Sequence, residues 1–228
     1  MPVNMIAVDD RGASPLVPPN RDDALRRAIR GSGLAIPVIA WVVAVAIGYA
    51  LINRYSTTPG ERGQPPGKWP SDSGLVRSPD RANLVMCVHP RCPCTRASMA
   101  ELNEIVADHP GRMQVHILIL KPAELPESWS ATDIWKSAGE IPGARVVFDR
   151  NGAESRRFGA AASGHVTLFD RQGRLAFSGG VTPSRGHRGQ NAGSQAVSDL
   201  LEDHPAASGA AVYGCPLFEK HCPAEDRR

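Results

Sequence analysis

The sequence predicts an α/β domain, with a central sheet between layers of helix, joined to one membrane-spanning helix near the N-terminus. Two continuous apolar runs, 84–88 and 113–120, have the length of strands that are buried on both faces. An amphipathic stretch between them, 96–108, has the period of a helix, so the three segments predict a parallel βαβ unit. The uncharged apolar stretch 34–52 is long enough to cross a bilayer.

The apolar stretch 34–52 also predicts where the rest of the chain lies. Arginines cluster before it and only Arg54 follows closely, so the positive-inside rule places the N-terminus in the cytoplasm. A cleaved signal peptide is the alternative, but the run is long and starts far from Met1. We therefore expect an uncleaved single-pass anchor with a C-terminal domain in an extracytoplasmic, periplasmic space, where disulfides persist.

Composition divides the chain into segments of different character. These are a polar cytoplasmic tail (1–32), the transmembrane anchor (33–53), a Pro/Gly-rich linker (54–80), the folded domain (81–205) and a cysteine-containing tail (206–228). The linker is expected to be a semi-extended spacer that holds the domain away from the membrane. The net charge of +3 is too small to imply a nucleic-acid partner.

The remaining elements of the domain follow from apolar runs and turn signals. A weak helix at 130–138 leads to a short strand at 145–148. A hairpin pairs 166–169 with 174–178 across a turn that ends in glycine, and 195–201 begins a last helix. The order β-α-β-α-β-β-α predicts a mixed sheet with helices on both faces.

Thiol chemistry is predicted at the turn after the first strand. This turn contains Cys92 and Cys94, and the helix 96–108 begins directly after it. Unsatisfied N–H groups and the helix dipole at that position favour a thiolate, the form that attacks disulfides and binds metals. Arg91 adds a positive charge beside the thiols, and the hydroxyl of Thr95 is expected to hydrogen-bond to the thiolate.

The segment Arg-Cys-Pro-Cys-Thr-Arg-Ala-Ser-Met-Ala-Glu-Leu (91–102), followed by Asp-x-x-Gly at 149–152 and 170–173, resembles the thioredoxin-like superfamily. The branch it resembles contains membrane-anchored extracytoplasmic thiol–disulfide reductases and peroxiredoxin-related proteins. The resemblance covers roughly residues 81–203. It implies a thioredoxin-like fold, with a central mixed sheet flanked by helices, and redox-active cysteines.

The sequence departs from the family pattern at two places. Cys92 falls on the family's attacking cysteine, but Thr95 falls on its resolving cysteine, and the second thiol stands at Cys94 instead. A disulfide within Cys-Pro-Cys would close a small, strained and labile ring, so the alternative is that another cysteine resolves Cys92. Gly164 and His165 occupy the place of the family's cis-proline, so the usual substrate-docking proline is missing.

The other cysteines leave several alternatives. Five cysteines is an odd number, so at least one is free or pairs between molecules. Cys87 lies inside an apolar strand and is expected to act as a small hydrophobe, with a resolving role as the alternative. Cys215 and Cys222 are expected to form a local disulfide that pins the tail. The tail could instead supply the thiol that resolves Cys92, or metal ligands with His221 beside Cys222.

The sequence therefore predicts a membrane-tethered thiol–disulfide oxidoreductase without a cofactor. Its expected partners are protein thiols or disulfides, or a membrane electron donor. The alternative is a thioredoxin-fold copper-binding or delivery module, in which Cys92, Cys94 and His165 supply soft ligands. His89 and His165 face the thiol turn if the family layout holds. The basic, glycine-rich loop 182–191 is a candidate anion site, and a scaffold with purely structural thiols is the third interpretation.

Overall fold

The structure is a computed structural model that describes residues 21–218, with side chains from residue 35 onward. The chain divides into two compact units, residues 1–51 and 52–228. Helix α1 spans Arg21–Thr57, and its section Ala35–Thr57 has a mean hydropathy of 2.4 with its side chains exposed. This length and composition fit the predicted membrane anchor, and they equally fit a signal sequence.

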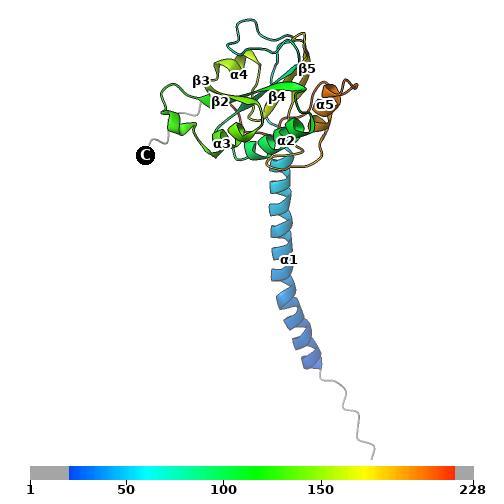
Figure 1. Ribbon diagram of the computed structural model, residues 1–228. Helices are drawn as coiled ribbons and strands as arrows, with labels where there is room; N and C mark the ends of the chain where they lie inside the picture. Colours follow the sequence, from blue (N-terminus) through cyan, green and yellow to red (C-terminus); the bar gives the residue numbers. More distant parts are fainter. Residues whose placement is uncertain (1–20, 219–228) are drawn as a thin grey trace, which may run out of the picture. The chain divides into compact units, whose positions relative to one another are not determined.

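The second unit is built on a five-stranded mixed sheet with the order β3-β2-β1-β4-β5 (Figure 1). The strands are β1 (Ala82–Val88), β2 (Met113–Lys121), β3 (Ala144–Arg150), β4 (His165–Phe169) and β5 (Leu175–Gly179). Strands β1, β2 and β3 pair in parallel, because helices connect them, whereas β4 runs antiparallel to both β1 and β5. The predicted α/β mixed sheet is confirmed.

The helices also lie close to their predicted places. They are α2 (Thr95–Asp108), the 3-10 turn η1 (Glu127–Trp129), α3 (Asp133–Glu140), α4 (Ala153–Arg157) and α5 (Ala192–Leu201). Helix α4 was not predicted, because a helix this short shows no apolar period. It begins after Gly152, whose φ of 68° lies in the left-handed region that glycine enters without steric cost.

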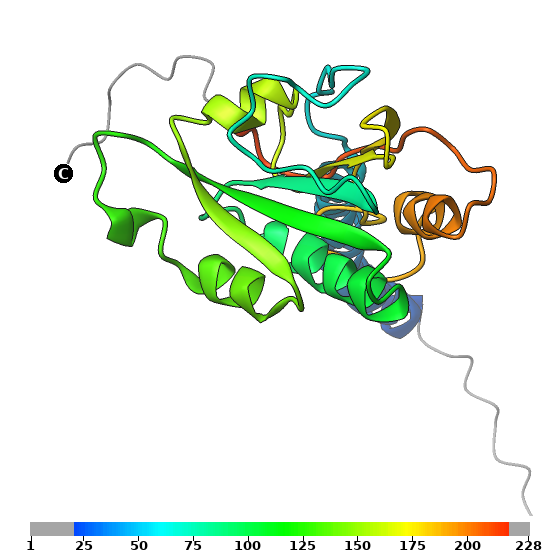
Figure 2. The ribbon, with the colours of Figure 1, turned by 45° about the horizontal axis from the view of Figure 1, so that its top comes forward.

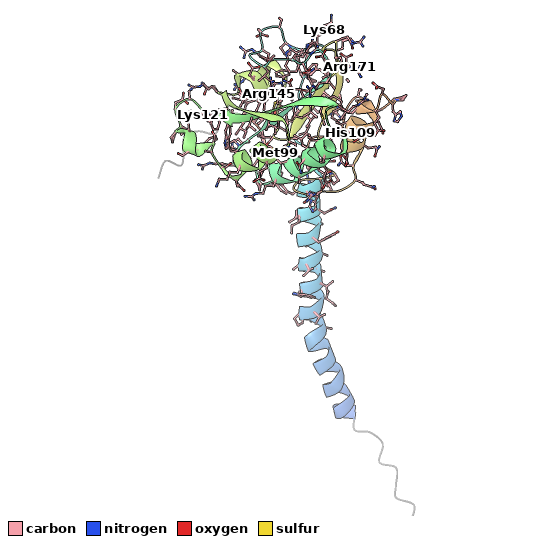
Figure 3. All side chains as sticks on the ribbon, in the orientation of Figure 1. Lys68, Met99, His109, Lys121, Arg145 and Arg171 are labelled. Carbon is pink, nitrogen blue, oxygen red and sulfur yellow. The ribbon has the colours of Figure 1, made fainter. Side chains whose placement is uncertain are left out.

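Each face of the sheet is covered by different chain segments. Helices α2 and α3 lie on one face, which we call the first face (Figure 2). Met99 of α2 (Figure 3) belongs to the buried core of this face, together with Leu102 of α2 and with Leu84 and Met86 of β1. The second face is covered by α4 and by segments from both sides of the predicted domain (Figure 2). Because both faces are covered, β1 is apolar at consecutive positions.

The predicted linker lies along the second face instead of standing away from the domain. The N–H of Gln64 donates to Gly159 O at 2.8 Å, and the N–H of Trp69 donates to Gly173 O at 2.7 Å. The Trp69 ring packs edge-on to the buried rings of Phe158 and Phe169. Contacts therefore group residues 52–228 as one unit, which extends beyond the predicted limits 81 and 205 on both sides.

Candidate thiol site

The turn between β1 and α2 places two thiols at the start of a helix, as predicted. The N–H of Cys92 donates to His89 O at 3.1 Å, and the N–H of Thr95 donates to Cys92 O at 3.1 Å. Cys94 is the N-cap residue of α2, and its side chain makes no capping hydrogen bond. Both cysteines are nearly covered, with Cys92 only 2% exposed and Cys94 7%. Their reactivity therefore depends on the groups that surround them.

A third thiol reaches this turn from the C-terminal end of the chain. The Sγ atoms of Cys92 and Cys215 are 3.1 Å apart, within hydrogen-bonding distance for sulfur. No disulfide joins Cys92 to Cys215 in the structure. The predicted pairing of Cys215 with Cys222 stays a prediction, because Cys222 lies outside the described residues. The structure brings together the pair that the sequence offered only as an alternative.

Residues 208–217, which we call the C-terminal strap, hold Cys215 in place. The N–H of Ser163 donates to Cys215 O at 2.8 Å, and the N–H of Leu217 donates to Ala161 O at 2.9 Å. Gly214 lies so close to Ser163 that a Cβ atom there would be 1.8 Å from Ser163 O. The strap is thus part of the folded unit, and Leu217 is buried in the second-face core.

The environment of Cys92 favours its charged form. Burial raises the pKa of its thiol, but hydrogen bonds outweigh burial and the pKa is lowered overall. The donors are the N–H and thiol of Cys215, the hydroxyl of Thr95 and the backbone of Cys94. Thr95 is thus among the groups that lower the pKa of Cys92, and its expected role beside the thiolate stays a prediction. A thiolate that accepts several hydrogen bonds is stabilised although it is buried.

The two neighbouring thiols have the opposite tendency. Burial raises the pKa of Cys94, and the adjacent Cys92 raises it further. Burial and the interaction with Cys92 raise the pKa of Cys215 to about 12. The positive charge of Arg185 opposes both shifts. Cys92 is therefore the thiol of this cluster that ionises most readily.

Two residues of the site escaped the sequence analysis. Arg185 belongs to the loop 182–191, and its Nη1 donates to Gly214 O at 2.7 Å, directly before Cys215. Ser163 accepts a hydrogen bond from the N–H of His89 at 2.8 Å, and its Oγ lies 2.7 Å from the Thr95 Oγ1. The basic composition of the loop was a usable signal for Arg185. No local sequence pattern indicates Ser163, because it is 68 positions from Thr95 and meets the turn only in the folded chain.

Two predicted site residues lie on the turn but contact other groups. The exposed guanidinium of Arg91 lies 5.0 Å from the centre of the Trp129 ring. The His89 ring packs edge-on to the same indole, with 5.5 Å between ring centres. The groups that lower the pKa of Cys92 do not include Arg91. A role for Arg91 in activating the thiol therefore stays a prediction.

Cys87 and His165 lie on the second face of the sheet. They are paired positions of β1 and β4, so their side chains share a face, and Cys87 packs in the second-face core. Burial raises the pKa of Cys87 to about 12 and lowers the pKa of His165 to about 4. His165 Nε2 lies 2.7 Å from Ser178 Oγ. Gly164 has a φ of 83°, and its N–H donates to Cys87 O at 2.8 Å.

The residues considered for copper are not assembled into one site. Among the described side chains, residues 35–218, no group of three or more His, Cys, Asp and Glu residues is arranged to hold a metal ion. Cys92 and Cys94 lie at the start of α2, whereas His165 lies beside Cys87 on the second face. Copper binding through these residues is therefore an untested prediction, and no geometry observed in the described region favours it.

Three parallel strands, an antiparallel hairpin and a cysteine turn that opens the first helix of the domain define a thioredoxin-like fold. No protein-family model matches the sequence, and no curated protein matches it. An uncharacterized conserved protein from Geobacillus kaustophilus matches at 19% identity and a TM-score of 0.50, over 73% of this chain and 95% of that one. A hypothetical protein from Sinorhizobium meliloti 1021 matches at 21% and 0.51, over 71% and 94%.

A secreted disulfide oxidoreductase from Mycobacterium tuberculosis also matches, at 10% identity and a TM-score of 0.38, over 54% of this chain and 81% of that one. At 19% and 21% identity, the two likenesses with TM-scores of 0.50 and 0.51 establish the fold alone.

Proposed function

We propose that this protein is a membrane-tethered thiol–disulfide oxidoreductase that acts outside the cytoplasmic membrane through Cys92 of its Cys-Pro-Cys motif. One observation carries the proposal. The Cys92 sulfur lies at the start of α2, has a lowered pKa, and is 3.1 Å from a second thiol. A reductase needs a nucleophilic thiolate and a second thiol within reach of it, and this site contains both.

The reaction begins when the Cys92 thiolate attacks one sulfur of a partner protein's disulfide. A mixed disulfide forms, the partner's S–S bond breaks, and its other sulfur leaves as a thiolate that takes up a proton. A second thiol of this protein then attacks the Cys92 sulfur and releases the partner's remaining thiol. The partner gains two electrons, this protein is left with a disulfide, and a thiol reductant or membrane electron donor must reduce it again.

The hydrogen bonds around Cys92 have a defined part in this reaction. The Cys92 sulfur carries negative charge before attack and again when it leaves. The hydroxyl of Thr95 and the N–H of Cys215 stabilise this negative charge both before attack and on departure. Because these donors are already in place, little reorganisation is needed when the charge returns to Cys92.

Helix α1 supports the tether. Its uncharged section matches the thickness of a bilayer core, and the arginines that precede it favour a cytoplasmic N-terminus. A tether would keep the thiol site at a high effective concentration near membrane-bound partners. Alkaline extraction of membranes should leave the full-length chain in the pellet. Release of a shortened chain would show instead that this segment is a cleaved signal sequence.

The activity is tested by insulin reduction with dithiothreitol as the electron source, using the full-length protein in detergent. The wild-type protein should accelerate insulin reduction, and Cys92→Ser should return it to the rate of dithiothreitol alone. Cys87→Ala is the matched control, because Cys87 is buried to the same extent, 2% exposed, but lies within β1 in the second-face core and not in the thiol turn. Full activity in Cys92→Ser would overturn the assignment of the nucleophile.

A further inference from the structure

The C-terminal strap delivers a thiol to the nucleophile from the far end of the chain. Cys215 is 123 positions from Cys92 in sequence, yet their sulfur atoms are 3.1 Å apart. We infer that Cys215 is the resolving thiol, so that the oxidised protein carries a Cys92–Cys215 disulfide that fastens the strap to the start of α2. This inference rests on the proposed function and adds to it the identity of the second thiol.

The position of Cys215 is determined by the fold of the strap on both sides of the cysteine. Its carbonyl accepts the Ser163 N–H, and Pro216 forms a bridge with Ala162. On the preceding side, Gly214 approaches the backbone of Ser163 more closely than any side chain would allow. A segment held at successive residues presents Cys215 to Cys92 in one orientation, which a loosely attached tail would not do.

Cys94 is the competing candidate, since it also interacts with Cys92. Its backbone is held in the first turn of α2, where the N–H of Ala97 donates to Cys94 O at 3.2 Å. A disulfide between Cys92 and Cys94 would close a very small ring of strained geometry, so it would distort the turn that begins α2. Cys215 approaches from a separate segment, and the turn can keep its hydrogen bonds when the bond forms.

Arg185 is placed to assist this second step as a positioning residue. Its guanidinium binds Gly214 O, beside Cys215, and its Nε donates to Thr58 O at 3.2 Å. Its charge also favours a thiolate at Cys215. This gives the loop 182–191 a function that its composition alone did not reveal, namely to hold the strap and its thiol at the site.

In the second step, the Cys215 thiol takes the partner's place on the Cys92 sulfur. Cys215 loses its proton to solvent as its sulfur attacks the Cys92 sulfur of the mixed disulfide. The bond between Cys92 and the partner breaks, and the partner's thiolate leaves and is protonated. One S–S bond forms and one breaks, while the two electrons lost by Cys92 and Cys215 are those gained by the partner's original disulfide.

Two measurements on the full-length protein in detergent test the inference. The first is peptide mapping after oxidation with excess oxidised glutathione, which should recover a peptide that joins residues 92 and 215. The second is trapping with insulin. Cys215→Ser should accumulate a mixed disulfide between Cys92 and insulin that lasts roughly tenfold longer than in the wild type or in Cys94→Ser. Thermal melting of each variant shows whether it is folded.

Gly214→Ala extends the test without removing a thiol. The added methyl group must displace the strap from Ser163, so the yield of the 92–215 peptide should fall, whereas Gly67→Ala, where a Cβ meets nothing within 4 Å, should leave it unchanged. Trapping in Cys94→Ser but not in Cys215→Ser, or a peptide joining 215 to 222, would overturn the inference and leave the proposed function standing. Insulin reduction by Cys92→Ser at the wild-type rate would instead overturn the proposed function.

Discussion

Cys92 and Cys87 are both 2% exposed, yet their thiols behave in opposite ways. Hydrogen-bond donors from the strap and the α2 turn surround Cys92 and lower its pKa despite burial. Cys87 lies in an apolar cluster, where burial and the nearby carboxylates of Asp149 and Glu154 raise its pKa to about 12. Burial alone therefore says nothing about the reactivity of a cysteine. What decides it is whether the surrounding groups can satisfy the negative charge.

The thiol site and the second face of the sheet differ in the same way as these two cysteines. The thiol site provides donors for an anion, whereas the second face favours the neutral forms of Cys87 and His165. His165 belongs to this second region, because burial lowers its pKa to about 4 and its Nδ1 has no hydrogen-bond partner among the described residues. The thiol region therefore favours an ionised, reactive cysteine, whereas the second face favours neutral side chains that pack in the core.

The largest difference should appear in alkylation of the two cysteines. In the reduced, folded protein near pH 7, iodoacetamide should modify Cys92 at least about 100-fold faster than Cys87, because the pKa of Cys92 is lowered whereas that of Cys87 is raised to about 12. Peptide mass mapping over time measures both rates in one sample. Equal rates would mean that the donors around Cys92 do not stabilise its thiolate.

The neutral state of His165 on the second face can be tested by measuring stability at falling pH. Folding lowers the pKa of His165 from 6.5 to about 4, so the folded state holds this residue neutral. The stability that depends on neutral His165 is complete above pH 6.5 and is lost as the pH falls toward the folded-state pKa. For His165 the free energy of unfolding should fall between about pH 6.5 and pH 4, by about 3 kcal/mol at most. Urea unfolding measured across this range should show a shallower fall for His165→Gln. The exposed His187→Gln is the control and should follow the wild type.

A smaller loss of stability is expected from the linker that covers the second face. A Cβ at Gly63 would lie 2.2 Å from Gly159 O and 2.3 Å from the His165 ring, so Gly63→Ala should destabilise the protein by about 2 kcal/mol. Gly67→Ala, in the same linker, has open space around its Cβ position and should cost much less. Urea unfolding at pH 7 compares the two variants. Equal stabilities would indicate that the linker does not pack on this face in solution.

The smallest effect concerns a single donor of the thiol site. Thr95→Val removes a hydroxyl that lowers the pKa of Cys92, so this pKa should rise in the variant. Thr95→Ser keeps a hydroxyl and should leave the pKa close to that of the wild type. The pH dependence of Cys92 alkylation reports this pKa directly. A Thr95→Val profile identical to that of the wild type would assign the whole effect to the strap and the helix backbone.

Most of the fold could be predicted because its elements carry their own signals. The apolar runs of β1 and β2 and the stripe that contains Met99 are local patterns, and each formed the expected element. The place of Cys92 was predictable for the same reason, since a helix start follows it directly. An influence of Thr95 on the Cys92 thiol was predictable because that residue lies within the same turn.

The parts that were missed depend on contacts between distant segments. His165 was expected near the thiols, but its register opposite Cys87 directs it to the second face. Shifting a strand by one position moves each side chain to the opposite face of the sheet. The sequence around His165 does not specify which face its side chain takes. The linker was expected to be a spacer because of its Pro and Gly content, although Trp69 anchors it to the second-face core.

By itself, the sequence determined the apolar anchor segment, the order of strands and helices, and a cysteine at the start of a helix, because these follow from neighbouring residues. Only the tertiary structure decided which thiol meets Cys92, which cation stands beside Cys215, and which titratable groups stay neutral. These depend on a strap, a loop and a strand register that meet only after folding. The physical reason is that an ionised sulfur is stabilised by whatever donors surround it in space, however far apart they are along the chain.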